Sequence, residues 1–143
     1  MKNLLILTAF FLCSVSLLQA QAPQAFNYQA VARDANNNPY QNTTLGIRIS
    51  LVRDNPNGAS DFIEEHQVVT TDLGVFTLQI GKGIPFIGNL SNVDWGAYSY
   101  YLNVEMDPSG GTNYLDMGVS QLLSVPYALY AGAAGDDEND LDT

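Results

Sequence analysis

Three adjacent residues, Glu64, Glu65 and His66, are the side chains of this sequence best suited to acid–base chemistry. Neighbouring side chains of a strand point to opposite faces, so Glu64 and His66 share one face and Glu65 lies on the other. A glycosidase needs two carboxylates that face each other across a cleft, and the sequence pattern pairs no second carboxylate with either glutamate. We therefore expect an exposed polar strand face here and no enzyme.

Few other side chains of this sequence are reactive. The 143 residues include one histidine and one cysteine, and that cysteine, Cys13, lies in an N-terminal apolar segment. Disulfides, cysteine-zinc sites, thiol catalysis, a Ser-His-Asp triad and a His-rich metal centre are thus nearly excluded, and no cofactor is expected. The 15 acidic residues outnumber the 5 basic ones, for a net charge of −10. This charge disfavours nucleic acid and anionic lipid as partners.

One turn has the spacing of a calcium-binding loop, because Asp34, Asn36 and Asn38 match its first three ligands. However, Pro39 stands where that loop needs glycine, and Leu45 stands where it needs a bidentate glutamate. An Asx-rich turn explains the same residues, since Asn and Asp tolerate left-handed backbone and bond their own backbone. We predict a turn and no metal site.

The densest aromatic cluster of the sequence consists of Trp95, Tyr98, Tyr100 and Tyr101. Strand alternation places Tyr98 and Tyr100 in one core-facing row with Leu102, and leaves Tyr101 and Trp95 outside. Exposed aromatic rings serve as platforms in sugar-binding modules. A carbohydrate-binding site at Trp95 and Tyr101 is therefore the alternative functional hypothesis.

Apolar and polar residues alternate at the period of a strand through most of the chain after residue 25, and turn-forming runs separate the segments at intervals of ~8–12 residues. This pattern, with about seven short strands, predicts an all-β fold: a single antiparallel β-sandwich of immunoglobulin or transthyretin type. The expected strands cover residues 26–33, 45–51, 62–71, 75–80, 98–106 and 114–130, with a less regular segment at 84–96. The side chains expected to face the core are Leu45, Ile47, Ile49, Phe76, Leu78, Ile80, Leu102 and Val104.

The two ends of the sequence differ from its middle. Residues 1–20 combine Lys2 with an apolar run of 15 residues, which predicts a secretory signal peptide cleaved after Ala20. That run is too short for a transmembrane helix, and no membrane span is expected. Residues 132–143 are small and acidic, which indicates a linker or the start of a stalk. The domain itself is expected at 23–131, in a protein that is secreted, extracellular or on the outer cell surface.

Three runs of the sequence, PQAFNYQAVARDANNNP, VVTTDLGVFTLQIG and YYLNVEMDPSGGTNYLDMGVSQLLSVPYALYA, resemble a known family. They are similar to the N-terminal β-sandwich domain of secreted and surface proteins of Bacteroidota, often called tail-fibre-domain or collagen-like proteins. The resemblance covers nearly all of residues 23–131. In that family the domain precedes collagen-like repeats, acidic linkers or fibrous β regions, and it supplies no catalytic residues. The chain ends inside such an acidic segment, which implies a fragment or a stand-alone copy.

Together, the residues and the resemblance predict a non-catalytic structural or interaction module of a secreted or cell-surface protein. The resemblance implies the N-terminal head or base of a fibre-like assembly. The expected partners are other proteins or the rest of a longer fibre-like chain. Surface glycans are the partners in the alternative hypothesis.

Overall fold

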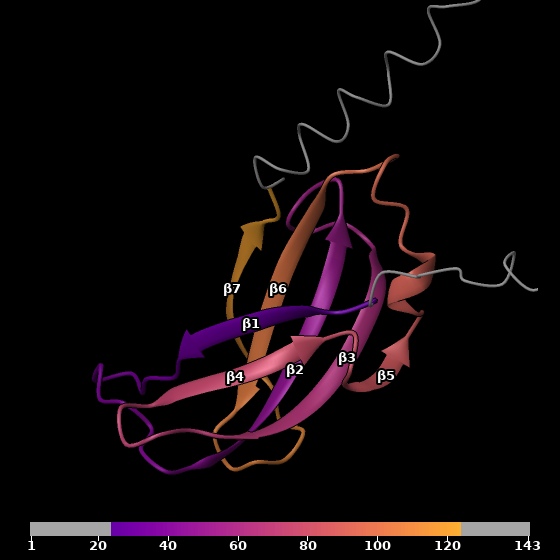
Figure 1. Ribbon diagram of the computed structural model, residues 1–143. Helices are drawn as coiled ribbons and strands as arrows, with labels where there is room; N and C mark the ends of the chain where they lie inside the picture. The colour runs from indigo at the N-terminus through magenta and orange to yellow at the C-terminus, as the bar shows by residue number, and fades with distance from the viewer. Residues whose placement is uncertain (1–23, 124–143) are drawn as a thin grey trace, which may run out of the picture.

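The computed structural model describes residues 24–123, which form an all-β sandwich with seven strands (Figure 1). The predicted all-β, antiparallel sandwich of about seven strands is therefore confirmed. The predicted signal peptide, the residues of the domain beyond Leu123 and the acidic segment lie outside the described residues. The strands are β1 (Phe26–Val31), β2 (Thr44–Arg53), β3 (Ser60–Val69), β4 (Val75–Ile80), β5 (Ile84–Ile87), β6 (Tyr100–Asp107) and β7 (Leu115–Gln121), with a short 3-10 helix, η2 (Leu90–Asn92), before β6.

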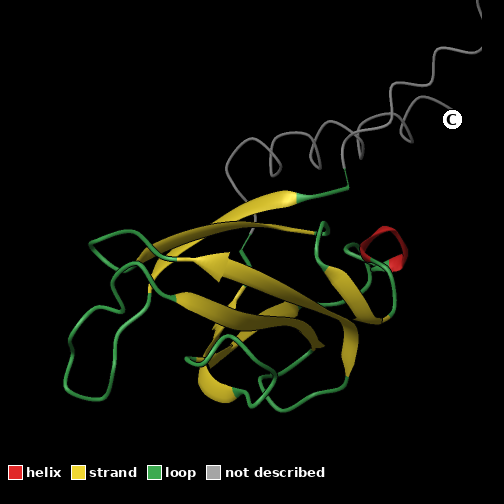
Figure 2. Ribbon diagram, turned by 90° about the horizontal axis from the view of Figure 1, so that it is seen from below, coloured by secondary structure: helices red, strands yellow, loops and turns green. Residues whose placement is uncertain are grey.

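The strands form two sheets of unequal size, and every strand pair is antiparallel. The larger sheet has the order β5-β3-β2-β6-β7, and the smaller contains β1 and β4. Figure 1 shows β1 and β4 running across β2 and β6, and Figure 2 shows the two layers from below. The smaller sheet covers only part of the larger one, which leaves the strands at its edges more exposed.

The core lies between these sheets, around the inward side chains of β2 and β4. Alternation predicts this row because every second residue of a strand points to the same face. Seven of the eight expected core side chains are buried: Leu45, Ile47, Ile49, Phe76, Leu78, Ile80 and Leu102. The eighth, Val104 on β6, is only half-buried and packs against the core cluster.

Tyr98, which is outside that list of eight but which alternation also places in a core-facing row, is exposed. Alternation predicts Tyr98 in a row with Tyr100 and Leu102, but 42% of its surface is accessible, whereas Tyr100 and Leu102 are buried. The physical reason is the strand boundary, because β6 begins at Tyr100 and Tyr98 belongs to the preceding loop. Strand alternation does not apply to a loop residue.

Among residues 24–123, no helix is long and apolar enough to cross a membrane.

Candidate functional site

Glu64 and His66, two of the three residues best suited to acid–base chemistry, lie in contact in the structure. Glu64 on β3 is only 1% exposed, and its Oε1 lies 2.8 Å from Nε2 of His66. The turn between β4 and β5 supplies two more partners: Oε1 accepts the backbone N–H of Gly81 at 2.8 Å, and Oε2 accepts that of Gly83 at 2.9 Å. The prediction that Glu64 lies on an exposed polar face is therefore wrong. Backbone N–H donors from this turn allow its carboxylate to be buried.

These hydrogen bonds decide the charge of Glu64. Burial by itself raises the pKa of this carboxyl, but the hydrogen bonds from His66, Gly81 and Gly83 outweigh burial and hold the pKa below its ordinary value. Both oxygens are thus ionised acceptors with fixed partners. A Cβ atom at residue 83 would lie 2.5 Å from Nε2 of His66, so glycine is needed there. The arrangement ties β3 to the β4–β5 turn.

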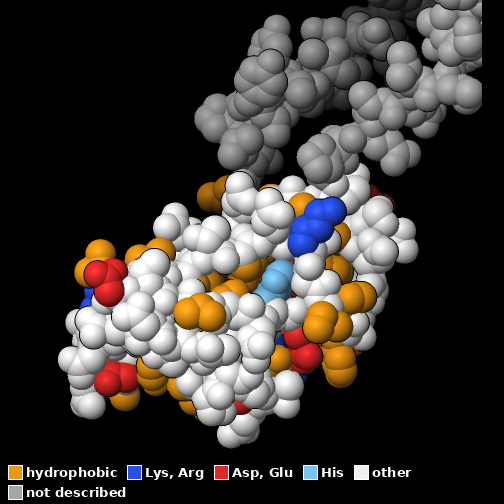
Figure 3. Space-filling model, turned by 60° about the horizontal axis from the view of Figure 1, so that its bottom comes forward, with side chains coloured by type: hydrophobic (Ala, Val, Ile, Leu, Met, Phe, Trp, Pro, Cys, Tyr) orange, Lys and Arg blue, Asp and Glu red, His pale blue; other side chains and the backbone are white. Residues whose placement is uncertain are grey.

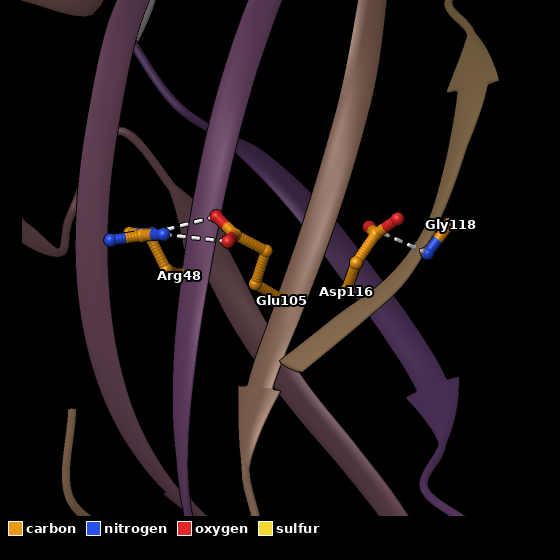
Figure 4. A network of polar contacts seen from close by, with 4 residues as sticks. All are labelled: Arg48, Glu105, Asp116 and Gly118. Atoms are coloured by element: carbon orange, nitrogen blue, oxygen red, sulfur yellow. Dashed lines mark hydrogen bonds and ion pairs between the residues drawn. The ribbon is translucent and has the colours of Figure 1, made fainter. Parts of the chain in front are cut away.

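The outer face of the larger sheet carries a second ion pair (Figure 4). Nε and Nη2 of Arg48 on β2 donate to Oε2 and Oε1 of Glu105 on β6, both at 2.6 Å. The guanidinium also lies 4.6 Å from the ring centre of Tyr114. Burial, and then the nearby Glu65 carboxylate, raise the pKa of the Tyr114 hydroxyl. This group holds β2 and β6 in register.

The Asp34 turn uses its own carboxylate. Oδ1 of Asp34 accepts the backbone N–H groups of Asn36 at 2.9 Å and Asn38 at 2.8 Å, and Asn37 adopts a positive φ of 67°. The predicted Asx-rich turn is confirmed, because its side chain and backbone make the bonds that such turns make. Among the described residues 24–123, no three His, Cys, Asp or Glu side chains are grouped so that they could hold a metal ion.

Trp95 lies in an aromatic cluster at one end of the sandwich. Its ring packs edge-on against Phe26, with centroids 6.4 Å apart, and against Tyr100, with centroids 5.3 Å apart. The hydroxyl of Tyr100 donates to Asp61 at 2.9 Å. Burial, followed by this bond, raises the pKa of Tyr100 to about 12, so the phenol stays neutral. Phe26 and Tyr100 thus support the inner side of Trp95, while 48% of the Trp95 surface remains exposed.

A groove of about 400 Å³ runs beside Trp95. Tyr98 and Tyr100 also line it, and Gln121–Leu123 form its other side. Arg53 stacks on the ring of Tyr98, 4.6 Å from its centre. The groove is lined by two exposed rings, Trp95 and Tyr98, and exposed rings can stack on a ring-shaped ligand.

The structure does not bring the two predicted ligand-binding residues together. Tyr101 follows Tyr100 on β6 and therefore points to the opposite face of the sheet, where it is half-buried between Val52 and Gln121. Trp95 contacts Tyr100 on the inner side. The aromatic partner of Trp95 along the groove is Tyr98, for which strand alternation predicts a place in the core.

The sequence prediction also misses an exposed apolar surface on β5. Ile84 is 73% exposed, Phe86 is 65% exposed, and Ile87 is exposed as well. We call these three residues the β5 patch. Figure 3 shows hydrophobic side chains, in orange, gathered on the face that also displays the histidine. The signal is present in the sequence, because Ile-Pro-Phe-Ile between two glycines is an apolar run without a polar alternate.

Comparison with known proteins gives a family match. A family model described as a domain of unknown function (DUF8740) matches residues 27–119, well over half of the chain. No curated protein and no solved structure matches. The matched segment begins in β1 and ends within β7, so it spans all seven strands.

Proposed function

The chain belongs to the DUF8740 family, and we propose that it is a non-catalytic interaction module of a secreted or cell-surface protein. In this proposal it forms the head or base of a fibre-like assembly, and it binds protein partners, or the rest of a longer chain, through the β5 patch. The resemblance to domains of Bacteroidota surface proteins supports the same role.

The observation that carries the proposal is the exposure of Ile84, Phe86 and Ile87 on a strand at the edge of the larger sheet. Large apolar side chains clustered at an edge mark contact sites more often than isolated ones do. Pro85 lies between them and removes one backbone donor from the edge. Contact by side chains is thus favoured over the addition of a further strand.

Charged substitution of the β5 patch tests this function. Ile84→Lys places a charge on an exposed side chain, so the thermal midpoint should stay close to that of the parent, whereas the protein should leave the cell-surface fraction. Thr77→Lys is the matched control, because Thr77 is also exposed but lies on β4 of the other sheet. Retention of Ile84→Lys at the surface, equal to that of the control, would contradict the proposal.

The groove beside Trp95 supports carbohydrate binding as a second candidate function. Trp95 and Tyr98 expose their rings along it, and Arg53 stacks on Tyr98. Tyr98→Ala should abolish retention on polysaccharide columns without unfolding the protein, because Tyr98 lies outside the core. Tyr101→Ala is the control, since Tyr101 faces away from the groove. Equal retention of both variants, or none by the parent, would refute glycan binding in this groove.

A further inference from the structure

A groove of about 440 Å³ opens between the two sheets, where β1 faces β7. Its floor is apolar and includes Ile47, Val104 and Met106 of the larger sheet. Tyr28 and its neighbours on β1 form one wall, and residues 118–120 of β7 form the other. The groove therefore reaches from the surface to the side chains of the core.

Among residues 24–123, nothing covers the inner side of β7 at this groove. Ser120 lies opposite the buried Leu102 and so points inward, yet it is exposed. A Cβ atom at Gly118 would have no heavy atom within 4 Å. Within residues 24–123, β1 pairs only with β4, and β7 pairs only with β6. The second layer thus covers β6 but leaves the inner side of β7 open.

β7 also lacks the usual protection of an edge strand. Its exposed side chains include Leu115, Met117 and Val119. Asp116 is its only charged residue, and its carboxylate accepts the backbone N–H of Gly118 at 3.1 Å (Figure 4). Natural edge strands are kept from pairing by charges, prolines, β-bulges or a covering segment. β7 has one charge, no proline and an irregularity opposite Val104 and Glu105, and a covering segment would add to this limited protection.

The sequence supplies such a segment directly after the groove. Residues 124–131 read Ser-Val-Pro-Tyr-Ala-Leu-Tyr-Ala, and the large apolar residues Val125, Tyr127 and Leu129 recur at the period of a strand. Leu123 follows Ser120 by about 10 Å of extended chain, and the eight residues after Leu123 can reach about 26 Å. The segment is therefore long enough to return to the groove. The covalent link also gives this segment a high effective concentration at the groove, which a separate molecule does not have.

We propose that residues 124–131 of the same chain occupy the groove between β1 and β7, with Val125, Tyr127 and Leu129 against its apolar floor. The net charge of −10 opposes a second copy as the occupant, because two such chains repel each other. The inference is independent of the β5 patch, which lies at the opposite edge of the larger sheet.

Disulfide mapping tests the inference. In the full chain carrying Cys13→Ser, Ser120→Cys is combined either with Tyr127→Cys or, as the matched control, with Ala128→Cys, and oxidised glutathione serves as the oxidant. The Tyr127→Cys pair should form a disulfide within one molecule about tenfold faster than the control, because its thiol is held at the groove. Thermal melting of both reduced variants verifies that each is folded.

Two results would overturn the inference. Equal rates for the two pairs, including no disulfide in either, would mean that the segment takes no fixed position in the groove. A disulfide found only in dimers would assign the groove to a second copy of the chain. A faster disulfide of the Tyr127→Cys pair in the monomer supports the inference, whatever the result for the β5 patch.

Discussion

Glu64→Gln should destabilise the fold strongly, although the two side chains have nearly the same shape. Glu64 is 1% exposed and accepts bonds from the backbone N–H groups of Gly81 and Gly83, with His66 as its third partner. Hydrogen bonds to a charged group contribute about 1.5–3 kcal/mol each. The substitution removes the negative charge. The new side-chain amide also carries an N–H group, which then faces the N–H donors that the carboxylate oxygens had accepted. We expect the free energy of unfolding to fall by about 3–5 kcal/mol.

Urea denaturation followed by circular dichroism at neutral pH measures this loss. The matched control is Glu65→Gln, which changes the same chemical group one residue further along β3. Glu65 is half-buried on the opposite face, where a surface pair is worth about 1 kcal/mol at most. If Glu64→Gln destabilises the protein no more than Glu65→Gln does, the account of a buried, ionised carboxylate is wrong.

The pH dependence gives an independent check of the same residue. The pKa of Glu64 in the folded state lies below its ordinary value of 4.5, so its stabilising contribution is present above that pH. This contribution is lost as the pH falls through the lower folded pKa. Below pH 4.5 the parent should therefore lose more unfolding free energy than Glu64→Gln, which has no group to protonate there. Identical acid dependence of the two proteins would contradict this reasoning.

Three further predictions concern the core and the two ends of the chain. Phe76→Ala should lower the unfolding free energy by about 3–5 kcal/mol, whereas the exposed Thr77→Ala should change it little; equal melting would mean that the register of β4 is wrong. Intact mass spectrometry of the secreted protein should give Gln21 as its first residue, and a retained leader would contradict this. Deletion of 132–143 should leave the thermal midpoint unchanged, whereas deletion from Gln121 onward should unfold the domain. A lower midpoint after the short deletion, or a calcium-dependent midpoint only with that segment present, would favour a metal site there.

Strand alternation predicts the core because burial repeats with the geometry of the chain. In β4, for example, Phe76, Leu78 and Ile80 are buried, and the predicted bounds agree with the observed strand. In β2 the inward row is predicted up to Ile49 for the same reason. Periodicity reports which residues share a face, and it works where one face of a strand packs on a core.

The errors arise where a distant segment or a strand end decides the environment. Alternation places Glu64 and His66 on the same face, as found, but it predicts that this face is exposed. The partner that permits burial of Glu64 is the backbone of Gly81, 17 residues further along the chain. The prediction for Tyr98 is wrong because β6 begins two residues later. Neither a long-range backbone donor nor a strand boundary has a periodic signature.

Photo-cross-linking at the β5 patch tests the central claim of an interaction module most directly. With p-benzoylphenylalanine in place of Phe86, irradiation of intact cells should produce a covalent adduct with a protein partner, and external protease should digest it. The same residue in place of Thr77, on the other sheet, should give no adduct. An adduct at neither position, or at both equally, would contradict the claim that the β5 patch is the contact surface.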